Sequence, residues 1–150
     1  MGIDFSRLRD HVISQFPCDP ISIHGPAHWK RVESNALVIA PTNGATVEVV
    51  RLFALFHDCR RTHDGYDNTH GARAADYASQ LRGHLFELPN DQFQLLHYAC
   101  TWHTHGQLSD DPTIGACWDA DRLDLGRVGM RPSAQYMSTV KGRALANGIT

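Results

Sequence analysis

The sequence has few cysteines and little net charge, and these deficits exclude several classes of protein. None of its four cysteines, Cys18, Cys59, Cys100 and Cys117, belongs to a Cys-x-x-Cys pair. This spacing excludes a zinc ribbon and a thioredoxin-like motif, so we expect free and mostly buried thiols. The formal net charge of -2 provides no basic surface for sequence-independent binding of nucleic acid. A nucleic-acid polymer is therefore disfavoured as a partner, whereas a small phosphorylated substrate is not.

The sequence also lacks a long hydrophobic run. Its beginning, "MGIDFSRLRDHVISQF", has Asp4 and Arg7 where the apolar part of a signal peptide would start. No apolar stretch approaches the length that spans a bilayer. We therefore expect a cytoplasmic protein with no membrane partner.

No repeat, linker or alternating strand pattern interrupts the chain, so we expect one domain over residues 1–150. Apolar residues recur instead at helical spacing, and proline, glycine and capping residues separate the helices. The sequence thus predicts an all-α, single-domain helical bundle or orthogonal array of about six to seven helices. We expect these helices over 4–16, from Pro26 to Pro41, from Thr46 to Cys59, over 69–83, from Asn90 to Trp102 or His103, from Asp111 to Gly126, and from Pro132 through Val140.

Histidines and aspartates stand near the ends of these predicted helices or beside polar loops. A bundle can bring such scattered residues to one cavity, because side chains from facing helices project inward. A mixture of imidazole and carboxylate ligands suits iron, manganese, zinc, cobalt or nickel better than calcium, which takes oxygen ligands. The candidate ligands are His28, His57, Asp58, His70, His103 and Asp121.

The order of these residues resembles the HD superfamily of metal-dependent phosphohydrolases. "HGPAHWKRV" supplies the first His, His28; "LFHDCRR" supplies the His57-Asp58 pair; and "DADRLD" supplies the last Asp, Asp121. "HGARAADYA" and "CTWHTHG" resemble elements of the binuclear branch, the second of them an element of its dinucleoside-tetraphosphate hydrolases. The resemblance implies an HD-domain-like fold and one or two divalent ions (iron, manganese, cobalt, nickel, zinc or magnesium). It makes His70 and His103 ligands of the second ion and Asp58 a bridge between the two.

Neighbouring residues compete for several of these roles. His63 is a rival to His70, and His97 and His105 are rivals to His103. Because a helix turns about 100° per residue, His103 and His105 would point in nearly opposite directions if both were helical, so we expect one of them to be a ligand. The family match selects His103, which leaves His105 to contact substrate. The same match selects Asp121 over Asp119, which stays the alternative ligand or the partner of a nearby arginine.

The resemblance implies a metal-dependent phosphohydrolase that cleaves a phosphoric ester or anhydride of a nucleotide or other small phosphorylated metabolite through metal-activated water. It does not favour an alarmone, because Arg60, Arg61 and Thr62 replace the Glu-Asp pair of the related alarmone hydrolases. We expect Asp58, Arg61 and His105 to act in catalysis, with Arg61 on phosphate. Other candidates for phosphate or a base are Lys30, Arg31, Arg60, Arg73, Arg127, Arg131, Trp29 and Trp102.

Three other functions use the same ligand types: an HD-type di-iron oxygenase, a non-catalytic nucleotide-binding regulatory HD module, and a purely structural metal site. The sequence leaves the oligomeric state open, with a homodimer as one option. Cys59, next to the His-Asp pair, has no candidate base beside it and is not expected to act as a nucleophile.

Overall fold

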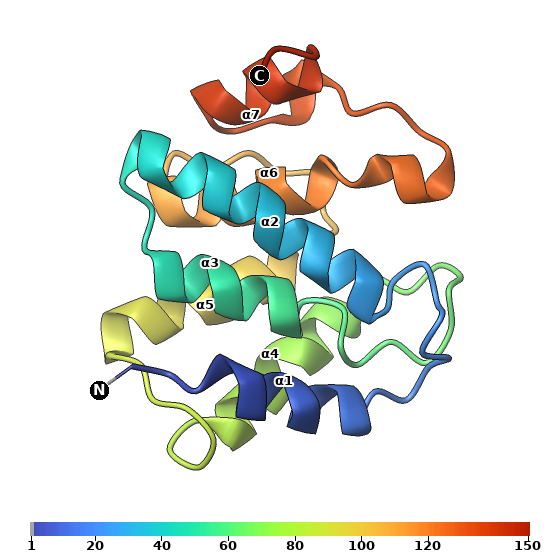
Figure 1. Ribbon diagram of the computed structural model, residues 1–150, viewed down its shortest axis with the longest axis vertical. Coiled ribbons are helices and arrows are strands. Elements are labelled where there is room, and N and C mark those ends of the chain that lie inside the picture. The colour runs from blue at the N-terminus through green and yellow to red at the C-terminus, as the bar shows by residue number, and fades with distance from the viewer. Residues whose placement is uncertain (1) are drawn as a thin grey trace.

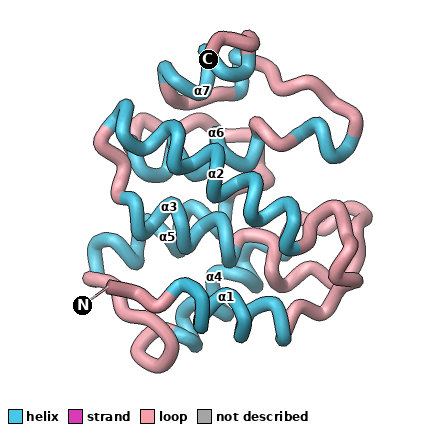
Figure 2. Tube along the Cα trace, in the orientation of Figure 1, coloured by secondary structure: helices cyan, strands magenta, loops and turns pink. Residues whose placement is uncertain are grey.

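The computed structural model describes residues 2–150 and is all-α, as predicted (Figures 1 and 2). Within this range there is no β-strand, and the isolated bridge between Arg82 and Phe86 is the one β-type pairing. Two short 3-10 helices follow the sixth α-helix, over Leu125–Val128 and Ala134–Tyr136. The α-helices are α1 (Phe5–Ser14), α2 (Pro26–Asn43), α3 (Val47–Phe56), α4 (His70–Leu81), α5 (Asn90–Trp102), α6 (Pro112–Arg122) and α7 (Val140–Ala146).

Helix α3 is the centre of the fold because it is apolar on nearly every side. The segment from Val49 to Phe56 is buried except for Arg51, which is half-buried and lies over the Phe5 ring. Helix α3 packs against α2, α5, α6, α4 and α1, and α7 lies at the opposite end of the molecule from α1 (Figure 1). Burying each large apolar side chain contributes about 1.5–3 kcal/mol. The hydrophobic effect therefore places the C-terminal end of α3, with its His-Asp pair, in the interior.

Pro41 does not end the second helix, contrary to the prediction. Helix α2 continues to Asn43 and stops at Gly44, whose φ of 76° is left-handed and whose amide bonds to the Ala40 carbonyl. A proline inside a helix removes one hydrogen bond. In the last turn this loss is small, so the left-handed glycine sets the end instead.

Three other predicted boundaries are wrong. Helix α3 ends at Phe56 rather than Cys59, and α6 ends at Arg122 rather than Gly126. No α-helix starts at Pro132, because α7 begins only at Val140. Its start is set by Thr139, whose hydroxyl accepts a hydrogen bond from the Gly142 amide at 2.9 Å. Among residues 2–150, no helix combines the length and the apolar character needed to cross a bilayer.

Candidate metal centre

The structure brings together all six side chains that the sequence predicts as metal ligands. All six are buried, and each is carried at or just beyond a helix end that points toward the same place. Burial of so many imidazoles and carboxylates is costly unless they are paired or bind an ion. They are His28 in the first turn of α2, His57 and Asp58 directly after α3, His70 at the start of α4, His103 directly after α5, and Asp121 in the last turn of α6.

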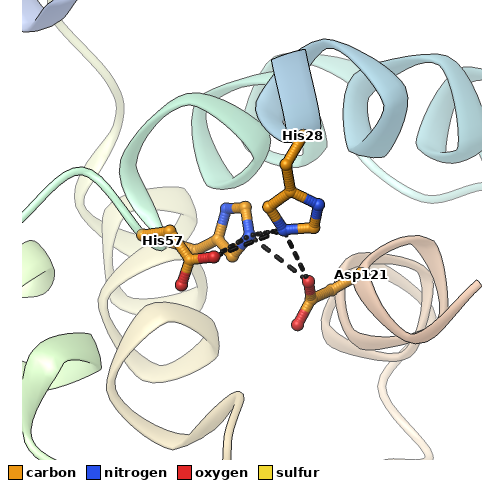
Figure 3. Close-up of side chains that lie close together, drawn as sticks. His28, His57 and Asp121 are labelled. Atoms are coloured by element: carbon orange, nitrogen blue, oxygen red, sulfur yellow. Dashed lines mark hydrogen bonds and ion pairs between the residues drawn. The ribbon is translucent and has the colours of Figure 1, made fainter. Parts of the chain in front are cut away.

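Four of these residues form the first group (Figure 3). The Nε2 atoms of His28 and His57 are 3.1 Å apart, and Asp121 Oδ1 lies 3.1 and 3.3 Å from them. Asp58 Oδ2 completes the group at 3.3 Å from His28 Nε2 and 3.5 Å from His57 Nε2. Two imidazoles and two carboxylates thus aim one atom each at a common point.

Asp58 also belongs to a second group, through its other oxygen. Asp58 Oδ1 lies 2.9 Å from His70 Nε2 and 3.3 Å from His103 Nε2, and these two nitrogens are 3.0 Å apart. One carboxylate therefore faces both groups, Oδ2 the first and Oδ1 the second. This arrangement is suited to a carboxylate that bridges two ions.

The other ring nitrogen of each histidine is tied to an acceptor. Backbone carbonyls lie 3.0 Å from His57 Nδ1, 2.6 Å from His70 Nδ1 and 2.7 Å from His103 Nδ1. His28 Nδ1 instead lies 2.6 Å from the carboxylate of Asp124. A hydrogen bond of this kind fixes the ring and leaves the Nε2 lone pair for a metal ion.

The spacing of these atoms fits a first-row divalent cation. Ligand atoms on bonds of about 2.1 Å lie about 3.0 Å apart in an octahedral site and about 3.4 Å apart in a tetrahedral one. The edges of the two groups, between 2.9 and 3.5 Å, cover this range. Asp121 Oδ1 is also a buried atom without a hydrogen-bond partner in the part of the chain that is described. The donor set therefore fits metal ions at both groups.

The charges of the ligand side chains also favour a bound cation. Burial by itself raises the pKa of Asp58 and of Asp121, but the facing histidines outweigh it and hold each pKa well below its usual range. Burial lowers the pKa of His28, and its contacts with the carboxylates of Asp121, Asp124 and Asp58 outweigh it and raise that pKa to about 10. Without a metal, a proton on His28 thus partly neutralises the carboxylates, and a cation competes with that proton.

Gly71 allows the second group to form. A Cβ atom at this position would lie 2.3 Å from the Cys100 carbonyl oxygen, 3.0 Å from that of Thr101 and 3.2 Å from His103 Nδ1. Helix α4 therefore approaches the end of α5 at a distance that only glycine permits. This close approach sets His70 beside His103.

The rival residues lie outside both groups. His63 is exposed on the loop before α4, and its Nδ1 accepts a hydrogen bond from the Gly65 amide. The ring of His97 is half-buried and lies 4.0 Å from Asp76. Asp119 points toward the C-terminal segment, where its carboxylate accepts hydrogen bonds from the amides and a hydroxyl at the start of α7.

The residues predicted to act on substrate border the second group. Arg61 is buried, with its Nε 3.8 Å from Asp58 Oδ1. His105 is exposed, with its ring edge-on to Trp102 at 5.0 Å. A cavity of about 250 Å³ lies between them, lined by Arg61, Tyr66, Asp67, Asn68, Thr104 and His105. Arg61 therefore lines this cavity and also lies close to the Asp58 carboxylate of the second group.

Most of the other predicted cations have partners elsewhere. Arg31 pairs with Asp124 and Arg73 with Asp67, and Arg60 donates to the Gln15 carbonyl. Of the predicted phosphate-binding cations, and within residues 2–150, the side chains of Arg61 and Arg127 are the ones that lie within 4 Å of a carboxylate of the two groups. Lys30 and Arg131 are exposed.

The aromatic and thiol candidates have structural surroundings. Trp29 is buried, donates to the His24 carbonyl at 2.7 Å and packs edge-on against Phe16, so it belongs to the core rather than to a base pocket. Trp102 is partly exposed beside His105. Burial raises the pKa of the Cys59 thiol well above its usual value, which keeps it un-ionised.

Two features of the site are missing from the predicted set. Asp124 orients His28, and the only signal for it was its place one helical turn after Asp121. His24 is buried with its ring centroid 6.4 Å from that of His28, and its Nδ1 lies 3.0 Å from the Asp64 carboxylate. Burial lowers the pKa of His24, and the Asp64 contact opposes this. Its spacing of four residues from His28 in "HGPAH" was the available signal.

Comparison with known proteins identifies one similar fold among solved structures. No protein-family model and no curated protein matches the chain. Its fold is similar to the crystal structure of a predicted HD superfamily hydrolase from an uncultured Thermotogales bacterium, with a TM-score of 0.75 and 25% sequence identity. The match covers 97% of this chain and 85% of the other. This similarity confirms the HD-domain-like fold that the sequence predicts, and the buried histidine and aspartate groups are compatible with an HD-type metal site.

Proposed function

We propose that the protein is a metal-dependent phosphohydrolase that binds two divalent ions and acts on a nucleotide or other small phosphorylated metabolite. The observation that carries this proposal is the position of Asp58, whose two carboxylate oxygens face two separate groups of histidines. A hydrolase is also the activity predicted for the similar Thermotogales protein.

The second group supplies fewer protein ligands than the first. It has three, from Asp58, His70 and His103, whereas the first has four. A site with three protein ligands keeps positions for water and substrate, which is typical of a catalytic rather than a structural ion. A cavity lined by Arg61 and His105 lies next to this group, since Arg61 Nε is 3.8 Å from Asp58 Oδ1. These features favour turnover over a purely structural role for the metal.

Bound divalent ions would lower the pKa of a coordinated water to about 7 and polarise phosphate oxygens. The protein's own residues do the remaining work. The carbonyl and carboxylate partners of the Nδ1 atoms hold the four imidazoles in place before substrate arrives. Arg61 directs a guanidinium toward the phosphate and stabilises negative charge as it develops. His105 contacts the substrate from the exposed loop.

The test combines metal analysis with a substrate screen. The protein is purified without chelators, its metal content is measured, and phosphate release from nucleotides and dinucleoside polyphosphates is followed with manganese under nitrogen. We expect two ions per chain and phosphate release from at least one class. Consumption of oxygen with iron in air, without phosphate release, would instead identify an oxygenase.

Two variants locate the activity. Changing His57 or Asp58 to Ala is expected to remove both metal retention and turnover, because each leaves buried ligands without their partner. His97→Ala is the matched control, since this histidine lies outside both groups. Full activity in His57→Ala or Asp58→Ala, or equal loss in His97→Ala, would contradict the proposed centre. Tight nucleotide binding without hydrolysis under any metal would identify a regulatory module.

A further inference from the structure

We propose that Arg127 is a second anion-binding residue of the centre, and that together with Arg61 it selects a substrate that ends in a terminal phosphoryl group rather than a phosphodiester. This inference rests on the proposed phosphohydrolase function. It concerns a residue that lies beside Asp121, whereas Arg61 lies beside Asp58.

Arg127 is held in place but has donors to spare. It lies in the 3-10 helix Leu125–Val128, and its side chain is 11% exposed. Its Nη1 donates to the Asp124 carbonyl at 2.7 Å, which anchors the guanidinium. Its Nη2 is 3.9 Å from Asp121 Oδ1, and its Nε is buried without a hydrogen-bond partner in the described chain.

Arg61 has the same arrangement beside Asp58. Its side chain is 10% exposed, and its Nη1 donates to the carbonyls of His63 and Gly65 at 3.2 and 2.9 Å. Its Nε is 3.8 Å from Asp58 Oδ1 and, like that of Arg127, is buried and unpartnered within residues 2–150. One tethered arginine therefore stands beside each of the two aspartates that the centre needs as ligands.

These contacts are not ordinary salt bridges. Separations of 3.8 and 3.9 Å are too long for hydrogen bonds. When the carboxylates bind divalent ions, each arginine also lies next to a positive ion that repels it. An anion bound to the ions would offset this repulsion and stabilise the guanidinium. Arg61 and Arg127 are thus positioned to bind an anion at the metal centre.

The number of donors indicates which kind of phosphate is bound. A phosphodiester has two non-bridging oxygens, and a pair of metal ions can engage both. A terminal phosphoryl group has three, so at least one oxygen remains for an arginine. Two arginines with free Nε–H groups therefore match a terminal phosphoryl group, as in a phosphomonoester or the end of a polyphosphate chain. A diester has no non-bridging oxygen beyond the two that the ions engage, so both arginines would have to share oxygens already bound to metal, which disfavours it.

The experiment measures binding rather than turnover. Inorganic phosphate, with three or more free oxygens, and dimethyl phosphate, with two, are titrated calorimetrically into the manganese-loaded protein. We expect the native protein to bind phosphate at least about tenfold more tightly than dimethyl phosphate. Arg127→Gln should weaken phosphate binding by about tenfold or more and change dimethyl phosphate binding by less than about threefold. Arg131→Gln, an exposed arginine four residues away, is the control and should leave both affinities unchanged.

Metal content is measured in every variant, so that loss of metal is not mistaken for loss of anion binding. Arg127→Lys keeps the charge but not the forked donors and should still weaken phosphate binding severalfold. If Arg127→Gln and Arg127→Lys both lose metal, a crystal structure of the native protein with tungstate decides: an Arg127 nitrogen on the oxyanion supports the proposal, and an oxyanion on the metals alone overturns it.

The outcomes separate this inference from the proposed function. Unchanged phosphate affinity in metal-loaded Arg127→Gln, or equal binding of the two phosphates by the native protein, overturns the role of Arg127 even if the protein is a hydrolase. Arg127-dependent phosphate binding by a protein that hydrolyses nothing would retain the inference and refute the proposed function.

Discussion

Replacing Gly71 by alanine tests how the second group of ligands is assembled. The added Cβ would lie 2.3 Å from the Cys100 carbonyl oxygen, whereas ordinary contact begins at 3.4 Å. The two atoms nearest to the added Cβ are the backbone carbonyl oxygens of Cys100 and Thr101 in α5, so no flexible side chain can absorb the overlap. Helix α4 must therefore move away from the end of α5 by about 1 Å.

A shift of this size is larger than a metal site tolerates. Metal–ligand distances vary by only about 0.2 Å, so His70 and His103 would no longer fit one ion together with Asp58. The first group does not involve α4 or α5 and should keep its ion. We expect the metal content to fall from two ions per chain to one, with affinity at the second group reduced by about 100-fold or more.

The same change should cost some stability. Overpacking of a core typically costs about 1–3 kcal/mol. Alanine recovers part of this through its higher helix propensity, up to about 1 kcal/mol. If alanine recovers this full amount, the net loss is about 0–2 kcal/mol, a decrease in Tm of up to roughly 8 °C for a chain of this size.

Metal analysis after dialysis against manganese and thermal unfolding followed by circular dichroism measure both effects. Gly126→Ala is the control, because a Cβ there meets no atom within 4 Å and the backbone has no positive φ. A folded Gly71→Ala protein that retains two ions with native affinity would refute the packing argument. So would the loss of both ions, because the first group would then depend on α4.

Three further results are expected. Asp124→Asn should weaken metal binding at the first group by about 10–100-fold without unfolding the protein, measured by competition with a chelating dye, because the amide is a poorer acceptor for His28 Nδ1–H. Metal affinity at the first group should rise about tenfold per pH unit between pH 6 and 9. The pKa of His28 is raised to about 10, so throughout this range a cation must displace the proton on His28 in order to bind. A metal affinity that does not change with pH would show that no such proton is displaced. Asp119→Ala should lower the free energy of unfolding in urea by about 2–5 kcal/mol, because it strands the buried Thr139 amide and hydroxyl, yet leave metal content unchanged; a loss of metal would place Asp119 in the centre after all.

The sequence was sufficient to predict the all-α class and the approximate positions of the first six helices. The apolar run before His57 could only be a buried helix, and the capping residue Asp111 and Pro112 marked the start of α6 correctly. Some of the wrong boundaries depend on distant contacts. The start of α7 is one such case, because Asp119, twenty residues earlier, binds the Thr139 amide and hydroxyl.

The six candidate ligands were also chosen from the sequence, through the order of a recognised motif. Their types and order follow from local sequence. The helical argument that separates His103 from His105 does not apply, because α5 ends at Trp102 and both histidines follow it. Only the tertiary structure showed that Asp58 divides its two oxygens between two groups. It also showed that Asp124 contacts His28 and that Arg127 lies beside Asp121. The reason is that periodicity determines which face of a helix a side chain occupies, whereas the distance between two side chains depends on how closely their helices pack, as Gly71 shows.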